Sequence, residues 1–147
     1  MTGADTSMDS AIEDVEEQFG VLFSRVRTSW KDAAAQIHPD LQPVGYKILS
    51  TIARSGSTNA HALSELLDVD KSVVSRQVRM LEDAGLVQSE ADARDGRARV
   101  LRPTPLAIER VNAVRSGNKG RLHELLRSWP ESDVRAFADM LGKLTAV

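Results

Sequence analysis

The sequence DKSVVSRQVRMLEDAG, at residues 70–85, decides the fold because it predicts a short helix with two chemically different faces. At about 100° per residue, apolar side chains repeat along one narrow stripe, and hydroxyl and cationic side chains gather opposite it. The stripe consists of Val74, Val78 and Leu81, and the opposite face of Ser72, Ser75, Arg76 and Arg79. One face can therefore pack against the rest of the protein, while the other stays available to a partner.

Both ends of this helix carry residues that bound helices. Asp70 is a natural N-cap, because its carboxylate can accept a free backbone N–H at the positive end of the helix dipole. Gly85 can adopt the left-handed conformation that ends a helix. The outward face, together with Lys71, carries no acid before Glu82, so its N-terminal half can enter a DNA major groove. A solvated amphipathic helix without a partner fits the same pattern.

The neighbouring segments favour the DNA-binding interpretation. A second short helix is predicted at 60–67, and two residues separate it from the first, which is typical of a helix-turn-helix. Two extended runs follow at 86–90 and 98–102, around a long tip with an Asp95-Gly96 turn signal, and they predict a β-hairpin. A helix-turn-helix followed by such a hairpin is a winged helix.

These motifs resemble the DNA-binding core of the MarR family of bacterial transcription regulators. The resemblance lies in LSELLDVDKSVVSRQVRMLEDAGLV at 63–87, followed by DARDGR at 92–97. The most specific part is the wing signature D-x-R-D-x-R, formed by Asp92, Arg94, Asp95 and Arg97. The match is close from residue 63 to about residue 102, and the flanking helices agree in pattern only. Two positions depart from the family: Asp68 stands where glycine is frequent, and Val73 where threonine is frequent.

The resemblance implies a DNA-binding site built from the recognition helix and the wing. An arginine of the helix can grip guanine at two points in the major groove. Arg94 would enter the adjacent minor groove, whose narrow A·T stretches attract guanidinium groups. Arg97 either contacts a phosphate or holds the wing tip through Asp92 or Asp95. The expected DNA-binding residues are Lys71, Ser72, Val73, Ser75, Arg76, Gln77, Arg79, Arg94 and Arg97.

The resemblance also implies a mode of action. We expect a mainly α fold with a small β-hairpin wing, in which a winged-helix head is joined to a helical dimerisation stem. The homodimer would bind double-stranded DNA at a pseudo-palindromic operator, and a small aromatic or other organic effector would release it. Repression rests on the resemblance alone, because nothing in the residues separates a repressor from an activator.

The flanking helices are too apolar for a domain of this size to cover. A helix predicted to open at Ser10 and to stop at His38-Pro39 carries an apolar residue at every third or fourth position along its whole length. Part of that stripe should bury against a second copy of the chain. The expected interface residues are Ile12, Val15, Phe19, Leu122, Leu125, Leu126, Trp129, Phe137 and Leu141.

The domain organisation follows from these elements. Gly117 and Gly120 fall inside a helix predicted to start at Thr104-Pro105, where they indicate either simple tolerance or a hinge. We expect a disordered tail at 1–8 and a single domain at 9–147, with the head at 42–103 and the stem at 9–38 and 104–147.

Composition limits the class of protein. The 147 residues suit one domain that leaves apolar surface for a partner, and the absence of cysteine excludes disulfides and thiol redox switches. No apolar run approaches a membrane span and no signal pattern opens the chain, so we expect a cytoplasmic protein. The net charge of −2 looks unfavourable for DNA, but acids crowd the first twenty residues while cations gather in the helix and the wing.

An enzyme is not expected, and no cofactor or metal is predicted. The three histidines are scattered and match neither a zinc-protease spacing nor a nucleophile motif, and no glycine-rich phosphate loop is present. His61 and Glu65 stand four apart on one helical face, which is typical of a surface pair. Trp30 and Tyr46 lie where MarR-like proteins hold their effector pocket, although either residue can equally be a packing residue.

Two alternatives to a ligand-responsive regulator remain at this point. A winged-helix dimer can act as a protein-interaction module, for which the negative net charge is no obstacle. A metal-sensing regulator is a variant of the first interpretation. Salt separates the first alternative, because binding driven by phosphates weakens steeply as salt rises.

Overall fold

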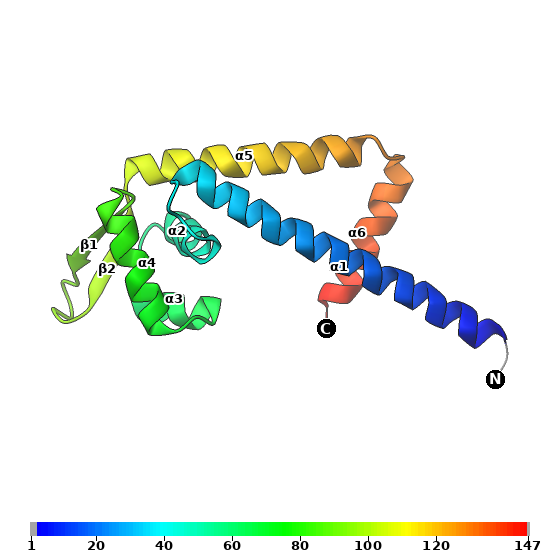
Figure 1. Cartoon of the computed structure of the whole chain (residues 1–147), viewed down its shortest axis with the longest axis horizontal. Coiled ribbons are helices and arrows are strands. Elements are labelled where there is room, and N and C mark those ends of the chain that lie inside the picture. Colours follow the sequence, from blue (N-terminus) through cyan, green and yellow to red (C-terminus); the bar gives the residue numbers. More distant parts are fainter. Residues whose placement is uncertain (1–2, 147) are drawn as a thin grey trace. The chain divides into compact units, whose positions relative to one another are not determined.

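The structure, a computed structural model, describes residues 3–146, which form helices and one two-stranded sheet (Figure 1). The elements are α1 (Gly3–Ile37), α2 (Pro43–Ser55), α3 (Ala60–Leu67), α4 (Lys71–Asp83), β1 (Val87–Ala91), β2 (Arg99–Pro103), α5 (Pro105–Arg127) and α6 (Glu131–Thr145). This order confirms the predicted fold class, mainly α with a hairpin wing. The chain divides into two compact units between Val111 and Asn112, inside α5.

The first unit contains the complete winged-helix head around one apolar core. α2 packs against α1, α3, α4 and β2, and α4 also packs against α3 and β1. The stripe predicted for the recognition helix is confirmed, because Val74, Val78 and Leu81 of α4 are all buried. The largest fully buried side chains are Ile37, Ile48, Leu49, Ile52, Leu63, Val74, Leu81, Leu86 and Val111. Apolar burial therefore fixes which side of α4 remains outside.

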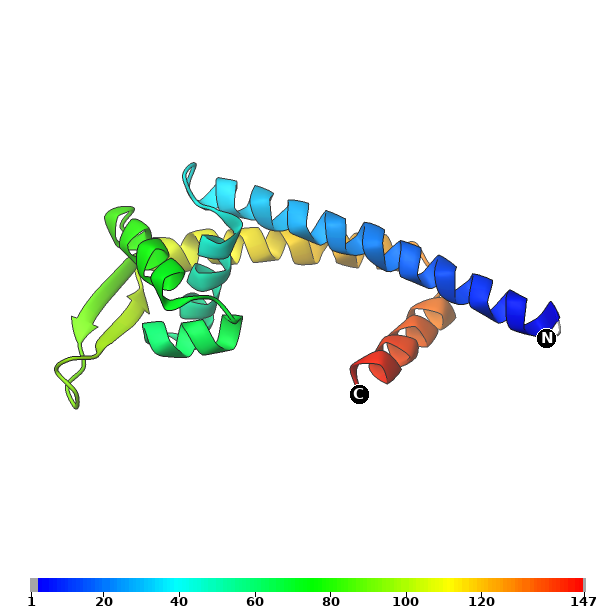
Figure 2. The same cartoon turned by 60° about the horizontal axis from the view of Figure 1, so that its bottom comes forward.

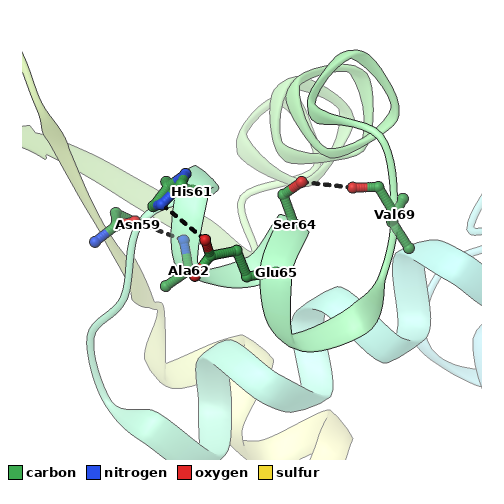
Figure 3. Close-up of polar contacts among 6 residues, drawn as sticks. All are labelled: Asn59, His61, Ala62, Ser64, Glu65 and Val69. Carbon is green, nitrogen blue, oxygen red and sulfur yellow. Dashed lines mark hydrogen bonds and ion pairs between the residues drawn. The ribbon is translucent and has the colours of Figure 1, made fainter.

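The turn between α3 and α4 is held by local hydrogen bonds, shown in Figure 3. The Asn59 side-chain oxygen caps α3 by accepting from the Ala62 N–H at 2.8 Å. The Ser64 hydroxyl donates to the Val69 carbonyl at 2.6 Å across the turn. Asp68 between them is left-handed, with φ 50° and ψ 52°. The position where the resembling family often has glycine is thus one that requires a positive φ.

The ends of α4 agree with the sequence in position and differ in one contact. Gly85 has φ 73°, as its role in ending the helix requires, and the Leu86 N–H donates to the Leu81 carbonyl at 2.9 Å. Asp70 occupies the N-cap, but its side chain makes no cap hydrogen bond. The Asp70 carbonyl instead accepts from the Val73 and Val74 N–H groups at 3.0 and 3.1 Å. The predicted carboxylate cap is therefore absent, since the exposed carboxylate stays in solvent.

The wing is an antiparallel hairpin that extends away from α3 and α4 in both views (Figures 1 and 2). Ser89 faces Leu101 in the register. The segment before α3 is joined to the wing, because Thr58 exchanges hydrogen bonds of 3.0 and 2.8 Å with Leu101. The base of the wing is therefore fixed to the helix-turn-helix.

Thr104 connects the wing to the start of α5. Its N–H donates to the Leu86 carbonyl at 3.1 Å, and its hydroxyl donates to the Gly85 carbonyl at 2.8 Å. The same hydroxyl oxygen accepts from the Ala107 N–H at 3.3 Å, as an N-cap does. One buried side chain thus joins the end of α4 to the start of α5.

The long helices differ in part from the sequence prediction. α1 begins at Gly3, so residues 3–8 are helical instead of a tail, with Asp5 in the first turn where an acid favours the helix. Met1 and Thr2 lie outside the described residues. α1 ends at Ile37 as predicted, and α5 passes through Gly117 and Gly120 without interruption. Among residues 3–146, no helix combines the length and the apolar character that crossing a membrane requires.

Candidate nucleic-acid interface

The outward face of α4 has the composition that the sequence predicts. Lys71, Ser72, Ser75, Arg76 and Arg79 are exposed, on the side of the helix away from its buried stripe. Val73 is half-buried, so part of its side chain remains accessible at the start of the helix. This face presents cations and hydroxyls, which are the groups that contact DNA phosphates and base edges.

The arginines of this face are not neutralised by neighbouring acids. Two ion pairs on exposed helix surfaces join His61 to Glu65 and Arg135 to Glu131, and neither involves this face. Within residues 3–146, Arg76 and Arg79 have no ion pair or hydrogen bond through their side chains. Their guanidinium groups therefore keep all five donors for a ligand.

Gln77 does not share this outward face. Its side chain is half-buried, and its amide oxygen is buried without a hydrogen-bond partner in the described structure. That oxygen lies against α2, since a Cβ added to Gly45 would come within 2.6 Å of it. The 3.6-residue period therefore turns this oxygen toward the neighbouring helix and away from the outward face, and the DNA contact expected of Gln77 stays a prediction. Gly45 allows that close approach.

The wing tip is shaped by its two aspartates. The Asp92 carboxylate accepts from the Arg94 N–H at 2.9 Å, and the Asp95 carboxylate accepts from the Arg97 N–H at 3.1 Å. The tip is closed by the Asp92 N–H, which donates to the Ala98 carbonyl at 2.9 Å. The acids therefore hold backbone groups, as turn aspartates do. The exposed side chains of both arginines have no ion pair in the part of the chain that the structure describes.

Arg99 is a wing residue that sequence reasoning missed. Its Nε donates to the Ser89 hydroxyl at 2.7 Å, and its Nη2 donates to the Ser89 carbonyl at 2.9 Å. Together with Arg79 and Arg97 it lines a groove of about 480 Å³ between α3, α4 and the hairpin. The available signal was the alternation of the strand, which places Arg99 on the same side as Leu101 and opposite to Arg102.

The two aromatic residues predicted for an effector pocket do come together. Trp30 and Tyr46 line a cavity of about 370 Å³ beside α2, with Lys47 and Arg54. The Lys47 ammonium lies 3.9 Å from the centre of the Trp30 ring, a cation–π contact. The pocket thus combines an aromatic wall with two cations.

The residues predicted for the dimer interface leave much apolar surface open. On α1, Ile12 and Val15 are 49% and 53% exposed, and the Phe19 ring stacks on Phe23 with centroids 5.7 Å apart. In the second unit, the rings of Trp129 and Phe137 meet edge to face at 5.8 Å. Leu122, Leu125, Trp129, Phe137 and Leu141 are exposed, and Phe19 and Leu126 are half-buried. The dimer itself remains a prediction.

The histidines form no metal cluster within residues 3–146, where no three His, Asp or Glu side chains gather. His61 Nε2 lies 3.2 Å from Glu65 Oε1 on exposed α3, as Figure 3 shows. His38 Nδ1 accepts a hydrogen bond from the Asp40 N–H at 3.1 Å.

Comparison with known proteins agrees with this geometry. The MarR family model matches residues 41–98, from the start of the head to the end of the wing tip. The HTH-type transcriptional regulator YxaD of Bacillus subtilis is 24% identical over 118 residues, which are 80% of this chain and 82% of that protein. The crystal structure of YusO from Bacillus subtilis matches with a TM-score of 0.77 at 19% identity, covering 95% of this chain and 97% of that one. Streptococcus pneumoniae FabT, crystallised in complex with DNA, matches with a TM-score of 0.81 at 15% identity, covering 92% and 95%.

Proposed function

We propose that the chain is a DNA-binding transcriptional regulator of the MarR family that recognises a specific operator, a proposal supported by the match of residues 41–98 to the family model and by the fold that it shares with similar proteins along most of their length. The observation that carries the proposal is the exposed face of α4, whose arginines have no ion pair within residues 3–146. A helix face whose only role is to contact solvent would be more stable if acids one turn away formed ion pairs with these cations.

In this proposal α4 reads the major groove. Arg76 lies in the middle of the exposed face and suits bidentate contact with the O6 and N7 atoms of guanine. Lys71 stands at the first position of α4 and suits a phosphate, because its ammonium is a flexible point charge. Ser72 and Ser75 supply hydroxyl groups between them. Arg76, near the centre of the helix, would thus recognise a base, and Lys71, at the start of the helix, would bind a phosphate.

The wing would enter the adjacent minor groove with Arg94. Its tip is ordered by the Asp92 and Asp95 turns, so the guanidinium is presented on a formed loop. Narrow A·T-rich minor grooves carry an enhanced negative potential that attracts such a group. This contact would add preference for flanking sequence outside the bases that α4 reads.

A homodimer would set the spacing of two such heads. The exposed apolar residues of α1, such as Ile12 and Val15, and those of α6, such as Phe137 and Leu141, support it, because patches of this kind mark interaction sites. Two heads related by a two-fold axis bind half-sites one helical turn or its multiples apart, which accounts for a pseudo-palindromic operator.

Release from DNA would follow from a population shift. An organic effector that carries an aromatic or anionic group fits the cavity of Trp30, Tyr46 and Lys47. We consider two conformations of the dimer, one whose head spacing matches the operator and one whose spacing does not. If the effector binds more tightly to the second, the affinity of the protein for DNA falls by the ratio of the effector's affinities for the two conformations. Repression is the simplest outcome of operator binding.

Selection of bound duplexes from a random DNA pool tests the proposal directly. We expect enrichment of a pseudo-palindrome whose half-sites are separated by about one helical turn. Binding of the enriched duplex should exceed binding of random duplex by at least about 10³ at the same salt concentration. A pool that shows no enrichment, with binding equal for all sequences, would contradict a sequence-specific regulator.

A further inference from the structure

The groove between α3, α4 and the hairpin has the charge of an anion site. Its lining includes three arginines, Arg79 from α4 and Arg97 and Arg99 from the wing, against the single acid Glu82. The polar side chains Asn59, His61, Ser75 and Ser89 complete its wall. Cations from two separate elements therefore converge on one hollow of about 480 Å³.

Arg99 is held in place before any ligand arrives. Its two hydrogen bonds to Ser89, of 2.7 and 2.9 Å, use one N–H of Nε and one of Nη2. Three of the five guanidinium donors remain, and they stay in a fixed plane because the anchored half cannot rotate. An arginine that is already ordered loses less conformational entropy when it binds an anion.

The position of the groove relative to the two DNA-reading elements identifies the anion. When α4 lies in a major groove and the wing in the adjacent minor groove, the sugar-phosphate strand that separates these grooves must pass between them. The groove occupies that place, since its walls are the side of α4 that carries Ser75 and Arg79 and the side of the hairpin that carries Arg97 and Arg99.

We propose that this groove binds one phosphate of the DNA backbone in each half-site, with the anchored Arg99 as its principal ligand and Arg97 as a second. The inference rests on the proposed function and adds to it a phosphate clamp that fixes the wing relative to α4. Glu82 opposes the phosphate from the same wall and limits the affinity of the clamp.

The strand alternation of β2 offers a matched control. Arg99 and Leu101 line the groove, whereas Arg102 is exposed and does not line it. Arg99→Gln and Arg102→Gln remove the same charge from the same strand, three positions apart. Using the operator duplex recovered by selection, we expect Arg99→Gln to weaken binding roughly tenfold per half-site. The slope of log K against log salt should also fall by about 0.9 per half-site. Arg102→Gln should change either quantity far less.

Chemical modification of the DNA, with the protein left unaltered, gives a test that does not depend on whether a variant folds. A scan of uncharged methylphosphonate linkages along the operator, with the wild-type protein, should find one linkage per half-site whose neutralisation matches the loss in Arg99→Gln. Combining that linkage with Arg99→Gln should cost little more than either change alone, because both remove the same contact. Additive losses, or an Arg99 variant no weaker than the Arg102 control, would overturn the clamp while leaving operator binding intact. A chain that binds no duplex would refute both proposals.

Two further variants test how the clamp is built. Ser89→Ala removes the hydroxyl that accepts from Arg99 Nε, so affinity should fall about threefold while the salt slope stays unchanged, since every charge remains. Glu82→Gln removes the opposing charge and should raise affinity for both operator and random duplex. An unchanged or lower affinity for Glu82→Gln would show that no phosphate approaches this wall.

Discussion

The left-handed Asp68 between α3 and α4 allows a prediction whose sign depends on backbone geometry alone. We consider Asp68→Gly and Asp68→Ala, which both remove the carboxylate and differ by one Cβ. At φ 50° and ψ 52° a Cβ costs about 1–2 kcal/mol. Glycine loses about 0.4–1 kcal/mol through the greater entropy of its unfolded chain. The Ala variant should therefore be about 0.5–1 kcal/mol less stable than the Gly variant.

Urea unfolding followed by helical circular dichroism, at one fixed protein concentration, measures this difference. It corresponds to a midpoint lower by about 0.2–0.5 M urea for Asp68→Ala. The same pair of substitutions at Asp32, exposed within α1, supplies the control, because there Ala should exceed Gly by about 1 kcal/mol. The reasoning fails if the order of the two variants is the same at both positions.

Three other predictions concern DNA and the dimer. In DNA-binding titrations, Arg76→Ala should cost about 1–3 kcal/mol of binding free energy per half-site on the selected operator and relax base preference. Lys71→Ala should instead weaken binding to operator and random DNA alike, and equal losses on both DNAs for Arg76→Ala would show that Arg76 does not read bases. Arg94→Ala should leave the melting temperature unchanged and lower operator affinity at least tenfold, with a larger loss for A-tract flanks than for G·C-rich flanks. A variant that binds operators with either flank as strongly as the wild-type protein would exclude the minor-groove role of Arg94. Substitution of both Phe19 and Leu126 by charged residues should give a monomer or an insoluble chain in sedimentation experiments. If the unaltered protein is a well-folded monomer at micromolar concentration, the assignment of a dimerisation stem is wrong.

The sequence predicts the head well because its signals are local. The apolar period of α4, the glycine at its C-terminal end and the short link to α3 each involve residues close together in the chain, and each is found. The left-handed turn at Asp68 is consistent with the glycine that relatives often carry there. The start of α1 is not predictable in this way, because the residues before Ser10 are mostly weak helix formers and α1 nevertheless continues through them to Gly3.

The features that sequence missed depend on contacts between elements. The burial of the Gln77 oxygen is set by Gly45, thirty-two positions earlier on α2. The anchoring of Arg99 depends on the register that brings Ser89 within reach across the hairpin. A helical wheel or a list of cations contains no information about either partner. The sequence therefore predicts which residue types lie on the candidate DNA-contacting face. The orientation of their side chains follows only from the packed structure.

Thr104 takes part in four hydrogen bonds, which join the end of the recognition helix to the start of the long helix that follows the wing. α5 begins directly after Thr104, so the position of its first turn is tied to the end of α4. A rotation of the first turn of α5 would therefore reach the end of α4 through the contacts of Thr104 with Gly85 and Leu86. These contacts involve no residue of the wing tip, so a change in the length or sequence of the tip would leave the connection between the two helices in place.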